Sequence, residues 1–445
     1  MLPPGIIESA QLINDLDQSL LAGFANLNHA HEEALGRLGR IYGDTPFGRR
    51  LAASLDELVN GVFQPAAFVA LAAGRAALQG AQYDRLAAHI RQELGRPAAP
   101  DQAGAPAMLQ NPPPLLASAR HWLMDLAVAG FGRLDPAMIG AFASTLGQLQ
   151  ADPAFLRTAA ALAGWMPELL LQPEPVPLFR WCDVWSRAML TTLSVSAAPA
   201  VRSVDGTLYP LGLDWRQHAA MVSLVAYGVL EAGGSAELVT ITRSAYKVAA
   251  IQQDQLWLLF PEIAPLLESL GAAKALRLRA MPLAPGGHLL WDERAAEIVG
   301  AFKPMDLAES YFAPGAARPI NRSATPAEQR HPVHLAEPIA LAGYRLAQDG
   351  DGWTVRAGEH AFALDLRHAA GTEITAEAVG AAERLFGLLR FDAGAWHLRP
   401  LYLSPKKGKA VFIGAESGKI LAKAPKGHAV GILKERASRL LREKA

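Results

Sequence analysis

Proline placement constrains the folding of this 445-residue chain more than any other feature, because proline ends helices and cannot donate to a β-ladder. Six prolines fall within residues 97–114, and five fall within residues 313–338. Such density favours extended, exposed connectors. Together with a change of pattern after Pro199, the two stretches divide the chain into blocks with different apolar periodicities.

Residues 1–198 have the pattern of a helical domain that contains the connector at 97–114. Apolar residues between Ile6 and Phe24 recur every three or four positions, which is typical of one apolar stripe on a helix. A proline at the first helical position costs no hydrogen bond, and a preceding Thr or Asp can cap the helix. We expect a helix to begin at each of four such sites: Thr45-Pro46, Gln64-Pro65, Asp135-Pro136 and Asp152-Pro153.

This helical block contains a weak internal similarity. Gly61–Gln79 aligns with Gly132–Gln150 at an offset of 71 residues, and seven of nineteen positions match, three of them alanines. A duplicated helical hairpin would explain the match, and so would chance combined with shared helix-start residues. Both explanations stay open at this point.

Residues 199–312 mix helix and strand patterns and are expected to form an α/β unit. The elements that we expect there are a hairpin turning on Asp205-Gly206, helices at 213–231, 255–270 and 292–302, and strands at 237–249 and 275–281. A linker is expected at 313–338. The next unit, 339–403, is expected to be β-rich, with strands at 341–348, 353–357, 361–366 and 395–403 and a helix at 375–389. The fold class is therefore α+β and multidomain, with a mostly α-helical N-terminal half.

Composition favours a folded, soluble protein. Hydrophobic residues make up 51% of the chain and charged residues 19%, so long disordered stretches are not expected. The one cysteine, Cys182, excludes an internal disulfide. The first basic residue is Arg37, and no apolar run is long enough to span a bilayer, so we expect neither a signal peptide nor a membrane span. We expect a cytoplasmic location, and the Ala/Leu/Arg bias suggests a bacterial source.

Five patterns invite a catalytic or ligand-binding interpretation, and each also has a structural one. Gly414–Lys419 resembles a phosphate loop but has three residues between its glycines and lacks the Ser or Thr after the lysine, so a hairpin is favoured. His29 and Glu33 could share a metal, but no third ligand follows at a diagnostic spacing. His331 and His334 lie in the proline-rich linker, where a two-ligand site would be weak.

Cys182 and the Asp349–Gly352 segment are also interpreted structurally. A nucleophilic cysteine needs a cation or histidine to hold its thiolate, and sequence alone brings none near Cys182. Asp349–Gly352 resembles the start of a calcium loop, but no further acidic ligands follow at the required spacing, so a turn between strands is expected. We expect no cofactor and no metal.

The last 42 residues differ from the rest in charge. Residues 404–445 carry eleven Lys or Arg against three Glu, a balance of +8, and the chain is neutral overall, so residues 1–403 carry −8. We expect a hairpin and an amphipathic helix there, forming a basic tail. Its candidate partner-binding residues are Lys406, Lys407, Lys409, Lys419, Lys423, Lys426, Lys434, Arg436 and Arg439.

This tail leads to the main functional hypothesis. Lysine is a flexible point charge, so the cluster suits a diffuse anionic surface better than base-specific recognition. We expect a non-enzymatic interaction or adaptor subunit of a bacterial multiprotein assembly, with the tail docking on an acidic protein surface. That surface belongs either to another subunit or to residues 1–403 of this chain, which carry −8. The alternatives are an enzyme whose site is assembled from distant residues, association with nucleic-acid phosphates or anionic lipid through the tail, and a tail that is simply solvated.

Overall fold

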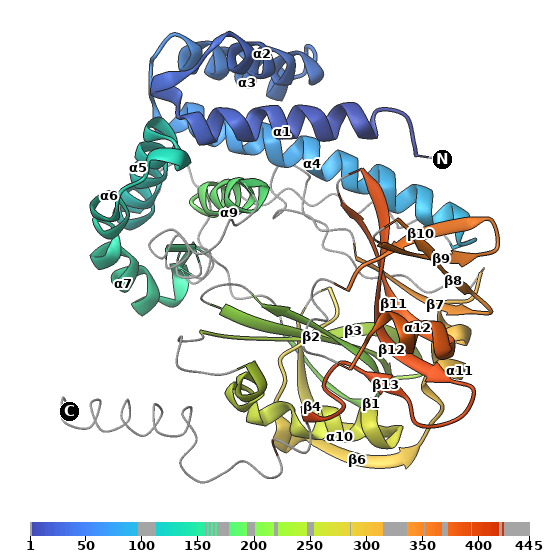
Figure 1. Ribbon diagram of the computed structural model, residues 1–445. Helices are drawn as coiled ribbons and strands as arrows, with labels where there is room; N and C mark the ends of the chain where they lie inside the picture. Colours follow the sequence, from blue (N-terminus) through green and yellow to red (C-terminus); the bar gives the residue numbers. More distant parts are fainter. Residues whose placement is uncertain are drawn as a thin grey trace, which may run out of the picture. The chain divides into compact units, whose positions relative to one another are not determined.

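The computed structural model shows an α+β multidomain protein that consists of two compact units (Figure 1). The first unit contains the described residues up to Ile90 and those between Pro113 and Leu193. The second contains Arg91–Arg96 and the described residues from Val201 onward. The structure describes residues 2–96, 113–155, 158, 159, 162, 165, 166, 178–193, 201–217, 221–246, 253–284, 286–314, 336–350, 352–366, 373–392, 394–417 and 421.

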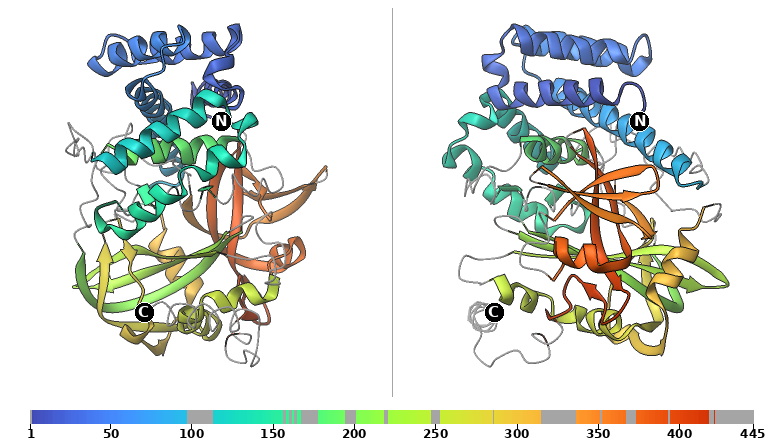
Figure 2. Two further views of the ribbon diagram at one scale, coloured as in Figure 1. Left: turned by 90° about the vertical axis from the view of Figure 1, so that its left-hand side faces the viewer. Right: turned by 45° about the vertical axis from the view of Figure 1, so that its right-hand side comes forward.

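The first unit is helical, as predicted. Its elements are α1 (Ile6–Ala22), η1 (Phe24–Asn26), α2 (His29–Ile41), α3 (Pro46–Val59), α4 (Pro65–Glu93, of which residues after Ile90 belong to the second unit), α5 (Pro114–Ala129), η2 (Phe131–Arg133), α6 (Pro136–Gly140), α7 (Ala143–Ala151), η3 (Pro153–Phe155) and α9 (Leu178–Thr191). α2 and α3 pack side by side (Figure 2). No described helix is both long and apolar enough to cross a membrane.

Helices begin at three of the four predicted sites, at Pro46, Pro65 and Pro136, whereas Asp152-Pro153 begins only the three-residue 3₁₀ turn η3. The Thr45 hydroxyl accepts a hydrogen bond from the Gly48 amide at 2.9 Å. The Asp135 carboxylate accepts one from the Met138 amide at 2.8 Å. Asp152 caps η3 in the same way through the Ala154 amide. Each side chain satisfies an amide that the helix itself leaves without an acceptor.

The first unit does contain an internal repeat, but at a different offset from the one expected. Helix α1 ends at Gly23 and α5 ends at Gly130, with φ of 89° and 92°; each is followed by one 3₁₀ turn and a new helix. The matching residues are 107 apart: Ala22/Ala129, Gly23/Gly130, Phe24/Phe131, Leu27/Leu134 and Ala30/Ala137, with the caps Asn28/Asp135 and Thr45/Asp152 at the same offset. We infer a duplicated helical motif.

The alignment of Gly61–Gln79 with Gly132–Gln150, at an offset of 71 residues, is therefore wrong. It matches a stretch that lies mostly within the single long helix α4 with a stretch that contains η2, α6 and α7. The shared Gly-Pro pattern reflected similar helix-start chemistry and not equivalent positions.

The two glycine turns of the repeat touch each other. A Cβ atom on Gly23 would lie 2.5 Å from the Ala129 carbonyl oxygen, and one on Gly130 would lie 2.6 Å from the Ala22 carbonyl carbon. Both glycines also have positive φ, which side chains of other residues rarely adopt. Backbone therefore packs directly on backbone where the two copies meet.

We predict that Gly130→Ala destabilises the first unit by about 2–5 kcal/mol, since it adds overpacking to backbone strain. Gly43→Ala is a matched control, because Gly43 also has positive φ (53°) but nothing lies within 4 Å of its Cβ position. Urea unfolding followed by far-UV circular dichroism should show the larger loss for Gly130→Ala. Equal losses in the two variants would contradict the packing argument.

A buried ion network joins three helices of this unit. The Arg75 guanidinium on α4 donates two hydrogen bonds to Asp17 on α1, at 2.7 and 2.9 Å, and one to Asp183 on α9 at 2.7 Å. These three side chains are at most 4% exposed. Burial raises the pKa of Asp17, although Arg75 opposes that shift. The network therefore depends on close pairing, because a buried charge without a partner is costly.

We predict that Arg75→Met lowers the unfolding free energy by about 3–5 kcal/mol, because it leaves two carboxylates buried without their cation. Arg85→Met, at an exposed position of the same helix, should change stability by less than about 0.5 kcal/mol. Thermal or urea unfolding of both variants tests the difference. A near-neutral Arg75→Met would show that the network adds no stability.

The second unit begins with a six-stranded sheet. Its strands are β1 (Arg202–Gln217), β2 (Met221–Ala232), β3 (Ser235–Tyr246), β4 (Lys274–Ala284), β5 (His288–Leu289) and β6 (Ala296–Ala301), in the order β1-β2-β3-β5-β4-β6. β1 also pairs with β4, so the pairings close into a ring. η4 (Gln253–Leu259), η5 (Pro261–Ile263) and α10 (Ala264–Ala272) follow β3, and η6 (Glu293–Ala295) precedes β6. The indoles of Trp215 and Trp257 stack with centroids 4.1 Å apart in its core.

Several predicted elements of this sheet are wrong. The helix expected at 213–231 is the end of β1 and most of β2, because Val222, Leu224 and Ala226 alternate into the core with a period of two. The helix expected at 292–302 is η6 and β6. Asp205-Gly206 is an irregularity within β1 and not a hairpin turn. Residues 237–246 of the strand expected at 237–249 belong to β3, and residues 247–249 lie outside the described residues. The strand expected at 275–281 is confirmed as part of β4.

A second sheet completes this unit. Its strands are β7 (Glu337–Ala342), β8 (Arg345–Asp349), β9 (Gly352–Ala357), β10 (His360–Leu364), β11 (Ala382–Asp392), β12 (Ala395–Pro405) and β13 (Val411–Phe412), in the order β7-β11-β12-β10-β9-β8, with β13 beside β12. α11 (Pro304–Tyr311) precedes it, and α12 (Ala376–Ala381) lies between β10 and β11. Thr375 caps α12 as predicted, but the helix stops at Ala381 and the rest of the expected helix is β11.

Arg96 directly precedes the proline-rich stretch at 97–114, and its side chain binds residues at both ends of the stretch at 313–338. Its guanidinium donates to the Glu337 carboxylate and the Pro338 carbonyl, each at 3.1 Å, and to the Phe312 carbonyl. It also lies 5.1 Å from the centre of the Phe312 ring. Glu337 and Pro338, expected to end the linker, instead begin β7. Residues 97–112 and 315–335 lie outside the described residues.

Candidate functional site

The described part of the basic tail is attached to the second sheet. β13 pairs with β12, and the Phe412 ring stacks on Tyr402 with centroids 6.0 Å apart. Phe412 and Ile413 are buried. Residues 404–413 are therefore part of the packed sheet, and the loop between the two strands is fixed at both ends.

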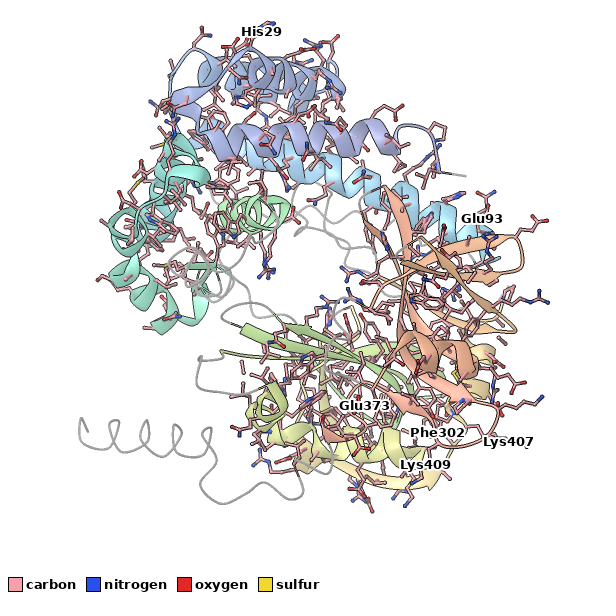
Figure 3. All side chains as sticks on the ribbon, in the orientation of Figure 1. His29, Glu93, Phe302, Glu373, Lys407 and Lys409 are labelled. Carbon is pink, nitrogen blue, oxygen red and sulfur yellow. The ribbon has the colours of Figure 1, made fainter. Side chains whose placement is uncertain are left out.

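Three of the candidate lysines lie on this loop. Lys406, Lys407 and Lys409 are exposed around Gly408, and Figure 3 labels Lys407 and Lys409. No ion pair joins these lysines to another described residue. The structure thus brings three of the expected partner-binding cations together on one loop. The others lie outside the described residues: Lys419, Lys423, Lys426, Lys434, Arg436 and Arg439.

In the segment that resembled a phosphate loop, Gly414–Lys419, backbone amides bind a carboxylate of the protein itself. The Glu373 side chain accepts hydrogen bonds from the backbone amides of Gly414, at 3.3 Å, and Glu416, at 2.7 Å. These amides are the groups that a phosphate loop would turn toward its ligand. The Gly414 Cβ position also meets the Trp257 ring at 2.9 Å, so this glycine serves close packing.

Cys182 lies beside the buried ion network of the first unit and not at a surface. Its side chain is 0% exposed, and burial raises the pKa of its thiol well above the ordinary value, with the Asp17 charge adding to the shift. A thiol in this setting stays protonated, so Cys182 has the properties of a packed structural residue.

Of the histidines in the candidate metal patterns, the structure describes His29 and its neighbour His31. His29 is almost fully exposed at the start of α2, and its imidazole lies 3.8 Å from Glu32 and not beside Glu33 (Figure 3). His31 completes a capping box with Asn28. His331 and His334 lie outside the described residues. Within the described ranges, no group of three His, Cys, Asp or Glu side chains is placed to hold a metal.

The Asp349–Gly352 segment forms the expected turn between β8 and β9. Asp349 and Gly352 are cross-strand partners, and Gly350 has φ of 58°. This geometry is that of a tight hairpin connection.

A cluster of charged residues that we did not predict from the sequence lies where the first sheet packs on the second. The Arg399 guanidinium on β12 donates to Asp214 on β1 at 3.0 Å and to Asp365 at 2.7 and 3.2 Å. Arg216 donates to the other oxygen of Asp214 at 2.7 Å. On β11, Arg390 lies opposite His397 of β12, two residues from Arg399.

Strand register explains how the cluster forms. Gly212, Asp214 and Arg216 alternate along β1 and so point to one face, which is turned toward β12. A Cβ atom on Gly212 would lie 2.9 Å from the Leu401 Cβ, so the sheets approach most closely there. Two residues further along each strand, Asp214 meets Arg399. The interface therefore changes from apolar to charged along its length.

Burial and neighbouring charges shift several pKa values in the cluster. Burial alone would raise the pKa of Asp214, but Arg216 and Arg399 hold it below its ordinary value of 3.8. Burial, together with the Asp214 charge, raises the pKa of Tyr227 to about 12. Burial and the charges of Arg399 and Arg216 lower the pKa of Arg390 to about 10. A signal was present in the sequence, since Asp214 and Arg216 interrupt an apolar run, but their partners are more than 150 residues away.

Comparisons of this chain with protein-family models, with curated proteins and with solved structures found no match.

We predict that Asp214→Asn reduces stability near neutral pH, and that the difference from the wild type shrinks as the pH falls. The folded-state pKa of Asp214 lies below 3.8, so its charge stabilises the fold above that value and the contribution is lost as the pH falls through the folded pKa. Urea midpoints from tryptophan fluorescence between about pH 5 and pH 3 measure this change. Asp349→Asn, at an exposed turn, should follow the wild-type pH dependence. If the difference in urea midpoint between Asp214→Asn and the wild type did not change with pH, the predicted contribution of the Asp214 charge to stability would be refuted.

Proposed function

We propose that this protein is a non-enzymatic interaction subunit of a bacterial cytoplasmic assembly, and that its basic C-terminal segment docks on an acidic surface of a partner protein. The observation that carries the proposal is the lysine loop, defined as residues Lys406–Lys409, which presents three exposed lysines from a fixed position on the second sheet.

Three other cations of the second unit each have a carboxylate partner, unlike the lysines of the loop. Lys303 lies 3.5 Å from Asp306, Arg384 lies 2.7 Å from the same carboxylate, and Arg294 lies 2.9 Å from Asp292. The lysines of the loop have no such ion pair with a described residue. Their charges thus remain available to an external anionic surface, which long-range attraction would steer toward the loop.

The fixed base of the loop favours docking over a purely solvating role. A loop held by β12 and β13 loses little conformational freedom when it binds, so more of the interaction free energy appears as affinity. Lysine also suits a protein surface of scattered carboxylates, because its single ammonium group imposes no planar geometry. The sequence after Ser417 adds further lysines to the same segment.

We predict that reversing the charge of the loop with Lys406→Glu, Lys407→Glu and Lys409→Glu together abolishes capture of the partner by the immobilised full-length protein. Capture should be strong at about 50 mM salt and weak at about 300 mM, since exposed charge pairs are screened. The bound proteins would be identified by mass spectrometry after capture from lysate of the source bacterium.

A control variant with the same change of net charge combines Lys274→Glu, Arg345→Glu and Arg356→Glu, which are exposed positions elsewhere in the second unit. It should keep the partner. Loss of capture after nuclease treatment would point to nucleic acid instead. Truncation at Leu403 is not a clean test, because it removes the buried Phe412 and Ile413. Equal capture by both triple variants would refute the docking role of the loop.

A further inference from the structure

Two arginines at the end of α4 lie close together because of the way in which the helix stops. Gly95 has φ of 62°, and its amide donates to the Gln92 carbonyl at 3.0 Å. The Arg96 amide donates to the Arg91 carbonyl at 2.8 Å. These two hydrogen bonds form a Schellman motif, in which apolar side chains often meet at the positions of Arg91 and Arg96. Here two guanidinium groups occupy those positions.

Both guanidiniums contact the same carboxylate oxygen, Oε1 of Glu337 on β7. Nη1 of Arg96 donates to this oxygen at 3.1 Å, whereas Nε of Arg91 lies 3.9 Å from it, which is too long for a hydrogen bond. The three side chains are at most 9% exposed. Two arginines and one glutamate carry a net charge of +1, and a buried charge without a counter-ion is unfavourable.

Each of these guanidiniums also has a buried nitrogen that is not used by the protein. Nη2 of Arg91 and Nε of Arg96 have no hydrogen-bond acceptor among the described residues. A buried donor without an acceptor is costly, and in native proteins such a donor commonly marks the place of a bound water or ion. The two unused donors belong to the same pair of side chains that carries the unbalanced charge.

The other contacts of Arg96 hold its guanidinium in one orientation. Nη1 also donates to the Pro338 carbonyl at 3.1 Å, and Nη2 donates to the Phe312 carbonyl at 3.4 Å. The Phe312 ring lies 5.1 Å from the guanidinium carbon. Burial lowers the pKa of Arg96; Glu337 opposes this shift, and the charge of Arg91 adds to it. Because the planar group is fixed on both amino nitrogens, Nε cannot turn toward another acceptor without breaking these contacts.

We propose that Arg91 and Arg96 together bind one small monovalent anion, chloride, through Nη2 of Arg91 and Nε of Arg96. A charge of −1 balances the excess of +1, and the ion supplies the acceptor that both donors lack. A water molecule would satisfy the donors but leave the charge unbalanced. Sulfate and phosphate are less suitable, because these buried nitrogens offer few donors for their four oxygens. This site goes beyond the proposed docking function and uses none of the residues of the lysine loop.

Thermal unfolding of the full-length protein tests the proposal. The protein is dialysed into chloride-free gluconate buffer and titrated with sodium chloride at constant ionic strength. The melting temperature of the wild type should rise saturably, by about 2–4 °C, because chloride binds the folded state only. Bromide should replace chloride, and Arg91→Met should abolish the rise. Arg91→Lys, which keeps the charge but lacks the planar fork, should retain only part of it. Comparison with the variant removes general effects of salt on stability.

Three controls separate ion binding from folding and from docking. In chloride-free buffer, Arg91→Met should melt at the same temperature as the wild type or higher, because Arg96 and Glu337 then form a pair of balanced charge. Arg356→Met, at an exposed position of β9, should respond to chloride like the wild type. The variant with three lysine-loop substitutions should also keep the chloride response, so failure of the docking proposal would not affect this result.

Bromide also locates the ion, because it gives an anomalous X-ray signal that water does not give. In crystals of the full-length protein grown with bromide as the halide, an anomalous peak should lie beside Nη2 of Arg91 and Nε of Arg96. Crystals of Arg91→Met should lack that peak.

Four results would overturn the chloride site. The first is a wild-type melting temperature that does not depend on chloride, and the second is an equal chloride response in Arg91→Met. The third is electron density beside the two nitrogens without an anomalous signal, which would show that only water is bound there. The fourth is a lower melting temperature of Arg91→Met in chloride-free buffer, which would show that the Arg91 charge is already balanced within the protein.

Discussion

The first unit depends on Arg75, whose guanidinium is buried between two carboxylates contributed by different helices. Hydrogen bonds at 2.7–2.9 Å tie α4 to both α1 and α9. Ion pairs of this kind add little net stability compared with apolar packing, but removing one partner is very costly. Their effect is specificity, because only one arrangement of the three helices satisfies all three charges.

Arg399 has the corresponding role in the second unit. It crosses from the second sheet to Asp214 of the first and also holds Asp365. The close approach at Gly212 fixes the distance between the sheets, and the charged pair fixes their register. The two arginine networks differ in one respect. Two carboxylates surround the single guanidinium of Arg75, whereas the guanidiniums of Arg216 and Arg399 share the carboxylate of Asp214.

Arginine and lysine have different roles in this protein, because the guanidinium and ammonium groups differ in shape and hydration. Arg75 and Arg399 lie within packed interfaces, where the planar guanidinium donates to several acceptors at once. The described lysines of the tail are exposed on a loop. A strongly hydrated ammonium is poorly suited to burial, so it remains at the surface, where it can meet an external partner.

The sequence by itself determined the helical first half, the sites where helices begin, and the charge asymmetry of the tail. These features are local: an N-cap such as Thr45 acts on an amide three residues away, and a proline acts on its own turn. Sequence periodicity was insufficient at 213–231, where buried β-strands have nearly continuous apolar character and resemble a helix.

Only the tertiary structure decided which distant charges meet. Arg75 and Asp183 are 108 residues apart, and Asp214 and Arg399 are 185 residues apart. It also decided the correct register of the internal repeat, because the Gly23 and Gly130 turns became recognisable as equivalent when their backbones were seen in contact. The physical reason is that pairing across such separations is set by strand register and helix packing, which no local sequence pattern encodes.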